Sequence, residues 1–352
     1  MGKQQVLSMD IGSDTIKFVM GKISKKYVEI DDFFMIKTPK ESYQDGRILD
    51  MHRLSTAIRH ILNDKKRRGK DAVITIQSTS VITREIILPS VHEEELKGMI
   101  QFEIQQYFPI HLEDYIVEYK IIEEYWQEGV QKVKILAAAL PKTIAEDFLA
   151  MMKELKLKPL ALDIHSNAIA KLFYPDTIIN DEKSCAQKTI SVIDIGNEQM
   201  NVNIISNGVV QFSRLVPMGG RLMNINLVNA LNLSYEEAEK KKTAYGLQKD
   251  EHSEQIADDI IQSMIWTSVD SWIQEIQRIF QYYTTRGLGN RVDEVYICGG
   301  SSHLHGIDQY LEKALNIPTA RIHALNNIKI KQHAVPAALH LYLNAAGALI
   351  RK

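Results

Sequence analysis

The chain has 352 residues, of which 45% are hydrophobic and 24% are charged, and its formal net charge is −2. This near-neutral balance provides no electrostatic basis for nucleic acid or an anionic membrane surface as the main partner. The two cysteines, Cys185 and Cys298, are too few for a disulfide framework or a cysteine-rich zinc site, and they fit a reducing cytoplasm. The length suits one large two-lobed unit or two medium domains.

No apolar stretch reaches the roughly eighteen residues expected of a transmembrane helix. The first residues do not have the pattern of a signal peptide, because Asp10 interrupts a short apolar run. The apolar segment at residues 340–352 is short and is predicted to be a buried helix rather than an anchor. We therefore expect no direct membrane insertion.

Strand and helix patterns alternate along the first part of the chain. Leu54, Ile58 and Leu62 recur at helical spacing and predict a helix over residues 51–65. Apolar and β-branched runs with short polar breaks predict strands at residues 6–11, 16–21, 28–36 and 72–77.

Residues 89–160 differ from their surroundings and are interpreted as an insertion. A helix is predicted after Pro89, then two strands that are joined near Gly129, then a helix that ends before Pro159. A helix–strand–strand–helix block of this size predicts a small subdomain of its own.

A second series of strands begins at residue 189. Asn207-Gly208 lies between two alternating apolar runs and predicts a tight hairpin turn. The pattern is mostly helical from 221 to 288, and a strand returns at 292–300 before a further helix.

The sequence contains one internal repeat. The segment SMDIGSDTIKFVMG near the start matches VIDIGNEQMNVNII in the second half, which pairs Asp10 with Asp194 and Gly12 with Gly196. Each copy reads as an apolar strand, then Asp-Ile-Gly, then a polar turn and a second strand. The repeat predicts two similar lobes that each present an Asp-x-Gly hairpin.

Such a hairpin has the chemistry of a phosphate and metal site. Glycine lets the backbone approach a phosphate closely, and successive N–H groups of a turn form a concave anion site. The carboxylates of Asp10 and Asp194 suit a hydrated Mg²⁺, which retains water and takes few carboxylates. Two facing hairpins would clamp a triphosphate. The alternative interpretation, that each copy is only a turn, is weakened by the matched strand context.

Two further segments support nucleotide binding. Gly299, Gly300 and Ser301 follow a predicted strand and precede a helix, so the backbone there can approach an adenine or a ribose. Glu239 and Lys242 lie three residues apart on one helix face, where they can hydrogen-bond ribose hydroxyls. The alternative for this pair is a surface ion pair.

Taken in order, these elements resemble the actin-like ATPase superfamily. The two hairpins, the Gly219-Gly220 turn, the Ala-Glu-x-x-Lys helix and the Gly-Gly-Ser turn match its features, and Asn344-Ala345-Ala346-Gly347 fits its second connecting helix. The resemblance covers nearly the whole chain. It implies an α/β, two-lobed actin-like ATPase fold, which is a duplicated ribonuclease-H-like fold.

Within the superfamily the chain most resembles the PilM family of type IV pilus assembly, which is related to FtsA. The insertion stands where FtsA and PilM carry the subdomain called 1C, and the run QFEIQQYFPIHLEDYIVEY (101–119) resembles the corresponding PilM stretch. FtsA-like proteins generally carry a C-terminal membrane helix, whereas this chain ends at Lys352 after the core helix. The resemblance implies these boundaries: 1A at 1–84 and 161–188, 1C at 85–160, 2A at 189–220 and 289–352, and 2B at 221–288.

The resemblance implies a cytoplasmic adaptor that binds ATP and Mg²⁺. It would dock the N-terminal cytoplasmic tail of a PilN-like inner-membrane protein and contact other pilus assembly proteins. Through these partners it would be recruited to the inner face of the cytoplasmic membrane. Self-association is left open. Asp10 and Asp194 would hold the metal through water. The residues expected to bind the nucleotide are Asp10, Gly12, Ser13, Asp14, Lys17, Asp194, Gly196, Asn197, Gly219, Gly220, Glu239, Lys242, Gly299, Gly300 and Ser301.

The sequence departs from strong ATPases of this superfamily. The second hairpin has no second glycine, Glu198 adds a negative charge near the phosphates, and Met223-Asn224 stands where relatives often have Thr-Asp. No carboxylate is recognisable as the group that polarises the attacking water, so we expect at most a slow ATPase. The catalytic residues are left open.

Two alternatives remain at this point. One is a filament-forming ATPase of cell division or shape, like FtsA or MreB, which would need a heterologous self-interface. The other is a small-molecule kinase on the same fold, which would need a catalytic aspartate. Asp163 and Asp270 are the candidates, but neither lies in a recognisable motif.

Overall fold

The computed structural model describes residues 5–66, 70–107, 111–247, 256–287, 289–331 and 338–351. The chain forms two compact units. The first contains Met1–Lys37, Ala72–Thr75 and Asp163–Lys352, and the second contains Thr38–Asp71 and Ile76–Leu162. Of the helices within the described ranges, none is both long enough and apolar enough to span a bilayer.

The first sheet of the first unit contains the N-terminal hairpin. Its strands run in the order β10-β6-β1-β2-β3-β18, where β10 is Lys158–Ile164, with β1 and β2 antiparallel, β2 and β3 antiparallel, and β18 parallel to β3. Their bounds are β1 Gln5–Ile11, β2 Thr15–Lys22, β3 Val28–Lys37, β6 Asp71–Ile76 and β18 Ile328–Ile330. The four strands predicted in this part of the sequence are confirmed.

The second sheet repeats the hairpin in the order β15-β14-β13-β16-β17. Asn207 and Gly208 both have positive φ (50° and 77°), so the predicted Asn-Gly turn between β14 and β15 is confirmed. The strands β16 and β17 are parallel extensions on the other side of β13. The bounds are β13 Thr189–Ile195, β14 Met200–Ser206, β15 Val209–Val216, β16 Glu294–Cys298 and β17 Thr319–Arg321.

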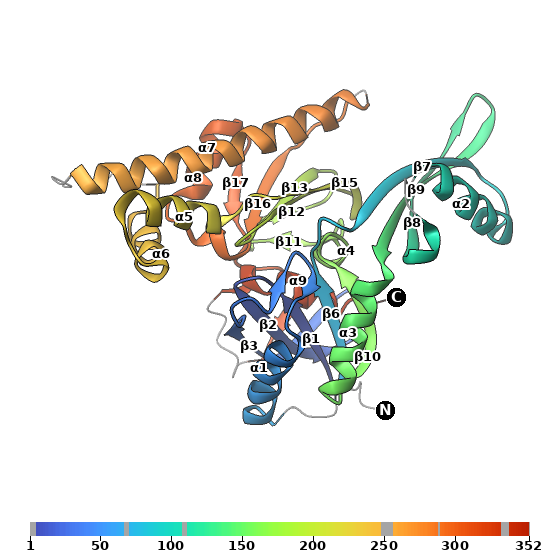
Figure 1. Ribbon diagram of the computed structural model, residues 1–352. Helices are drawn as coiled ribbons and strands as arrows, with labels where there is room; N and C mark the ends of the chain where they lie inside the picture. Colours follow the sequence, from blue (N-terminus) through green and yellow to red (C-terminus); the bar gives the residue numbers. More distant parts are fainter. Residues whose placement is uncertain are drawn as a thin grey trace. The chain divides into compact units, whose positions relative to one another are not determined.

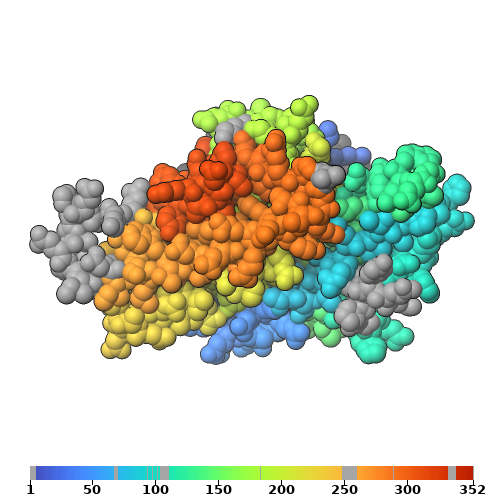
Figure 2. All heavy atoms as spheres, turned by 90° about the horizontal axis from the view of Figure 1, so that it is seen from above, coloured from blue at the N-terminus to red at the C-terminus, as the bar shows by residue number. Residues whose placement is uncertain are grey.

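Helices complete the first unit. Figure 1 shows the long helix α7 running past α5 and α8, and Figure 2 shows the orange atoms of α7 beside the yellow atoms of α5 and α6. Trp272 of α7 is buried in the same apolar cluster as Val202 of β14, so this tryptophan packs α7 on the second sheet. The bounds are α4 His165–Ala170, α5 Gly220–Leu231, α6 Tyr235–Tyr245, α7 Ile256–Thr285, α8 Ile307–Leu315 and α9 Leu343–Gly347. The buried helix predicted near the C-terminus is α9.

Short elements connect these parts of the first unit. They are β10 Lys158–Ile164, which enters the unit at Asp163 and leads into α4, β11 Ile178–Ile179, β12 Lys183–Ser184, and the single-turn helices η2 Gly300–His303 and η3 Leu339–Leu341.

The second unit contains the predicted insertion. Its three-stranded sheet has the order β7-β9-β8, and α2 packs on one face, where Leu96 and Ile100 meet Ile86 and Ile135. The predicted helix, two strands and helix are confirmed, but the sheet gains a third strand, β7, which we did not predict. Residues 108–110 of the PilM-like run lie outside the described residues. The bounds are β4 Tyr43–Gln44, β5 Arg47–Ile48, α1 Met51–Asp64, β7 Ile82–Pro89, α2 Glu93–Tyr107, η1 Leu112–Asp114, β8 Tyr115–Gln127, β9 Val130–Pro141 and α3 Lys142–Glu154.

Candidate functional site

The two Asp-x-Gly hairpins have the same backbone geometry. The N–H of Gly12 donates to the carbonyl of Thr15 (3.1 Å), and the N–H of Gly196 donates to the carbonyl of Gln199 (2.9 Å). A Cβ atom on Gly196 would lie 2.8 Å from the same Gln199 oxygen, so this turn closes only around glycine. The internal repeat read from the sequence is therefore a repeat of structure.

The hairpin register places a cation opposite only one of the two aspartates. Asp10 on β1 faces Lys17 on β2, whereas Asp194 on β13 faces Asn201 on β14. The Lys17 Nζ atom lies 3.4 Å from Asp10 Oδ2. Burial alone would raise the pKa of Asp10, but Lys17 and His165 outweigh it and lower that pKa to about 2. Burial opposes the charge of Lys17 as well, yet Asp10 and Asp194 raise its pKa.

The tips of the two hairpins meet. Asn197 Nδ2 donates to Ser13 Oγ (3.2 Å), which joins the second turn directly to the first. The first N–H groups of α5 reach the second turn, since Gly220 donates to the carbonyl of Gly196 (3.1 Å). Gly219 lies so close to this turn that its Cβ atom would overlap the Asn197 backbone. Segments far apart in sequence therefore gather around the second hairpin.

Glu198, the residue that departed from the family pattern, is neutralised. Its Oε1 atom lies 2.5 Å from Arg221 Nη1, at the first turn of α5. An ion pair of this kind cancels most of the repulsion that an isolated carboxylate would exert on phosphates.

The turn after β16 also reaches the second hairpin. Ser301 Oγ donates to the carbonyl of Gly196 (2.9 Å). Gly299 has a φ of 84° and packs on Asp194 and Ile195, where a Cβ atom would lie 2.7 Å from the Ile195 carbonyl. A Cβ atom on Gly300, by contrast, would meet nothing within 4 Å. The first glycine is thus required for packing, and the second faces open space.

Lys242 on α6 lies beside the same turns. A Cβ atom on Gly220 would stand 3.3 Å from its Nζ atom, and that amine lies 2.6 Å from Glu239 Oε2. Asn224 Nδ2 donates to the same Glu239 oxygen (2.5 Å). Lys242 is buried, whereas Lys240 is exposed. The Glu239–Lys242 pair is therefore partly buried and fixed.

Three candidate aspartates are engaged in polar contacts of their own. Asp14 pairs with Lys37 (3.0 Å), and both side chains are more than 40% exposed. Asp163, a candidate for the kinase alternative, accepts hydrogen bonds from Ile164 N, Asn167 Nδ2 and Lys171 Nζ at 2.7–2.9 Å. The other kinase candidate, Asp270, accepts a hydrogen bond from the Tyr310 hydroxyl (2.7 Å). A carboxylate whose oxygens are engaged as those of Asp163 are is unsuited to act as a base, and neither contact supports the kinase alternative.

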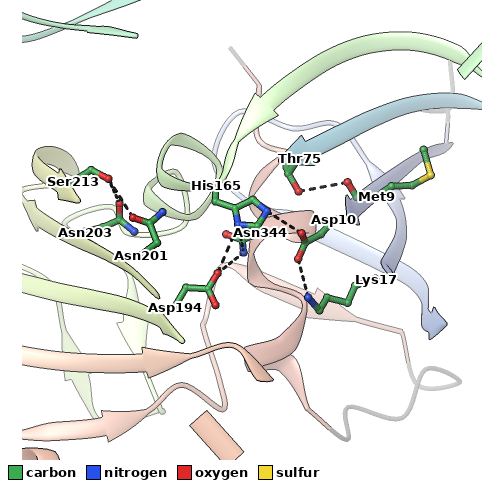
Figure 3. Close-up of polar contacts among 10 residues, drawn as sticks. All are labelled: Met9, Asp10, Lys17, Thr75, His165, Asp194, Asn201, Asn203, Ser213 and Asn344. Atoms are coloured by element: carbon green, nitrogen blue, oxygen red, sulfur yellow. Dashed lines mark hydrogen bonds and ion pairs between the residues drawn. The ribbon is translucent and has the colours of Figure 1, made fainter. Parts of the chain in front are cut away.

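His165 and Asn344 are site residues that the sequence analysis missed. His165 Nε2 lies 2.8 Å from Asp10 Oδ1, and Asn344 Nδ2 donates to Asp194 Oδ2 (2.7 Å) (Figure 3). His165 begins α4 and Asn344 lies in α9, and both are buried. His165 belongs to no motif recognised in the sequence, and Asn344 was noted only as part of the connecting helix, without a role at the site. Only tertiary packing brings the two side chains between the hairpins.

Comparison with known proteins identifies the family. The model of the family "Type IV pilus assembly protein PilM" matches residues 8–351. The chain belongs to the PilM family.

Solved structures show the fold of this PilM-family chain. A chain of a "PilM-PilN type IV pilus biogenesis complex" has a TM-score of 0.81, with 19% identity over 99% of both chains. EutJ of Carboxydothermus hydrogenoformans has a TM-score of 0.57 with 13% identity, covering 99% of this chain and 90% of that one. MreB5 of Spiroplasma citri bound to ADP has a TM-score of 0.56 with 16% identity, covering 99% of this chain and 95% of that one. The predicted actin-like ATPase fold is confirmed.

The donor set of the PilM-family site fits a hydrated metal ion better than a directly bound one. Among the residues described here, no three His, Cys, Asp or Glu side chains form a metal-binding group. Asp10 is engaged by Lys17 and His165, and one oxygen of Asp194 accepts from Asn344. Two carboxylates that keep such partners suit a Mg²⁺ ion held through its waters.

A histidine pair lies next to the Gly-Gly-Ser turn. The Nε2 atoms of His303 and His340 are 2.8 Å apart, and the Gly299 N–H donates to the His340 carbonyl (3.0 Å). Burial, His303 and Arg321 lower the pKa of His340 to about 3, and burial followed by Arg321 lowers the pKa of His303. Both rings are therefore neutral in the folded protein at pH 7.

We expect this pair to make the first unit sensitive to acid. An unfolded histidine takes up a proton near pH 6.5, whereas the folded pair resists it, so stability falls as pH drops below about 6.5. Between pH 7.5 and 5, His340 should contribute a loss of about 2 kcal/mol in the free energy of unfolding. Urea unfolding at the two pH values tests this, and His340→Gln should reduce the difference. An unchanged difference in that variant would contradict the assignment.

Proposed function

We propose that this chain is a nucleotide-binding adaptor of type IV pilus assembly. The observation that carries the proposal is the convergence of both hairpin tips, the start of α5, Lys242 and the Gly-Gly-Ser turn within one unit. Backbone N–H groups at glycine turns, together with Lys17 and Lys242, suit a polyphosphate anion. Membership of the PilM family supports the pilus assignment.

Individual residues of the site have different proposed roles in binding the nucleotide and the metal. Lys17 presents a partly buried cation beside the first hairpin, and the buried Lys242 presents a second cation beside Gly220. Gly300 leaves open space in which a ligand can approach the backbone, and Ser13 and Asn197 lie at the hairpin tips. We propose that Asp10 and Asp194 hold Mg²⁺ through water, where the ion supplies charge neutralisation for the phosphates. We propose that Asp14, Glu239 and the other predicted residues border the nucleotide.

The partner is proposed from the family and its complex. A structure titled as a PilM–PilN complex supports the docking of a PilN-like cytoplasmic tail, which would recruit this chain to the inner face of the cytoplasmic membrane. We propose that the sheet and helices of residues 85–160 form subdomain 1C and contribute to that docking, and that the other subdomains have the boundaries expected from the sequence. An FtsA- or MreB-like filament is not favoured, because the family match is to PilM.

Two measurements on the purified chain test the proposal. Calorimetric titration with Mg²⁺-ATP should show saturable binding, and phosphate release followed in the same sample should be slow. Titration of the ATP-loaded chain with a synthetic PilN-like tail peptide should show a second binding event. A chain that binds no nucleotide would refute the nucleotide role, and rapid turnover would refute the adaptor role.

A further inference from the structure

A continuous path of polar contacts joins the two hairpins behind the site. It begins at Lys17 and Asp10 (3.4 Å) and continues from Asp10 to His165 (2.8 Å). His165 Nδ1 then lies 3.3 Å from Asn344 Nδ2, which donates to Asp194 at 2.7 Å. Figure 3 shows these side chains in one row, with His165 and Asn344 between the two aspartates.

The partners of Asn344 determine how the middle of this path is arranged. Its amide has two N–H groups, and Nδ2 lies within reach of both the Asp194 carboxylate and the His165 ring. The reversed amide would place its oxygen against that carboxylate, which is repulsive. With the amide donating to Asp194, the same Nδ2 atom lies beside His165 Nδ1, and the other ring nitrogen of His165, Nε2, faces Asp10.

The path is buried from Asp10 to Asp194. Asp10 is 1% exposed, and His165, Asn344 and Asp194 are 6–8% exposed. Contacts to charged groups are strong in such surroundings, and an unpaired carboxylate there is costly. Each aspartate therefore depends on a side chain from a third element, α4 or α9, to keep its orientation.

We infer that His165 and Asn344 are positioning residues that hold Asp10 and Asp194 in the mutual arrangement required to receive a hydrated metal ion with its nucleotide. Neither side chain needs to touch the nucleotide, since each acts through an aspartate. The inference rests on the proposed nucleotide site and adds the residues that make its metal dependence possible.

The test compares nucleotide affinity with Mg²⁺ and with EDTA by calorimetry. The wild-type chain should bind ATP more tightly with Mg²⁺. His165→Leu and Asn344→Leu should each reduce this gain about tenfold, while affinity for metal-free ATP changes less than threefold. Because both residues belong to one path, the double variant should lose no more than the worse single variant.

Two further variants separate positioning from general stability. His165→Gln keeps an N–H donor toward Asp10, so it should retain more of the increase in ATP affinity that Mg²⁺ gives than His165→Leu does. If the leucine variant does not fold, the glutamine variant is measured in its place. Ser213→Ala removes a partly buried hydroxyl that donates to Asn201 and Asn203, outside the path, and should leave the gain in affinity from Mg²⁺ unchanged.

The outcomes are distinct. Equal losses with and without metal, additive losses in the double variant, or a wild-type chain that binds ATP equally well in EDTA would overturn the inference while leaving the nucleotide site intact. A wild-type chain that binds no ATP would instead refute the proposed function, and this inference with it.

Discussion

The Gly300→Asp variant is expected to lose ATP binding by at least about 100-fold while the chain still folds. A Cβ atom at this position meets nothing within 4 Å, so the new side chain fits without strain. Its carboxylate would occupy the space beside Ser301 that the proposed nucleotide needs. At about 4 Å, two like charges near a protein surface repel by up to about 4 kcal/mol, which is enough for this loss.

The matched control is Gly98→Asp in α2. This glycine also has open space around its Cβ position, and it belongs to the second unit, whereas both hairpins belong to the first, so the control adds the same charge outside the unit that carries the site. Calorimetry should show ATP affinity within twofold of the unmodified chain for Gly98→Asp. If Gly300→Asp binds ATP as well as this control, the Gly-Gly-Ser turn is not part of the site.

The Gly347→Ala variant is expected to destabilise the first unit by about 3 kcal/mol. Gly347 of α9 packs directly on α4, where an added Cβ atom would overlap the Ala168 carbonyl oxygen and lie 2.6 Å from its carbon. The obstacle is backbone, so one helix must move. Because α4 carries His165 and α9 carries Asn344, this movement also disturbs the polar path between the hairpins.

The distribution of tryptophans makes this effect measurable in one unit. The chain has three, of which Trp266 and Trp272 lie in α7 and Trp126 lies in the second unit. Trp126 is 72% exposed, so Trp126→Phe should be benign, and urea unfolding followed by fluorescence then reports the first unit. In that background Gly347→Ala should unfold at lower urea than its parent.

Gly98→Ala serves as the control for the glycine substitution itself. It adds the same methyl group at a helical position with nothing within 4 Å, and the gain in helix propensity is at most about 1 kcal/mol. Unfolding of this variant, measured by circular dichroism, should be unchanged or shifted to higher urea. An equally small effect of Gly347→Ala would mean that α4 and α9 do not pack as described.

The sequence by itself determined the local parts of this protein. Both Asp-x-Gly hairpins, the Asn207-Gly208 turn and the long helix α7 follow from patterns within a few residues, where hydrophobic periodicity and glycine chemistry act directly. The order of these parts also indicated the fold family, which the match over residues 8–351 confirmed.

Only the tertiary structure decided which side chains share the space between the hairpins. The contact from Asn344 to His165 spans 179 residues, and the contact from Asn344 to Asp194 spans 150. The sequence indicated a connecting helix that contains Asn344, but no local pattern encodes its pairing with His165, because the two residues lie in different helices that only tertiary packing brings together. Glu198 illustrates the same limit, since its charge was apparent from the sequence but its neutralisation by Arg221 depends on how α5 docks on the second hairpin.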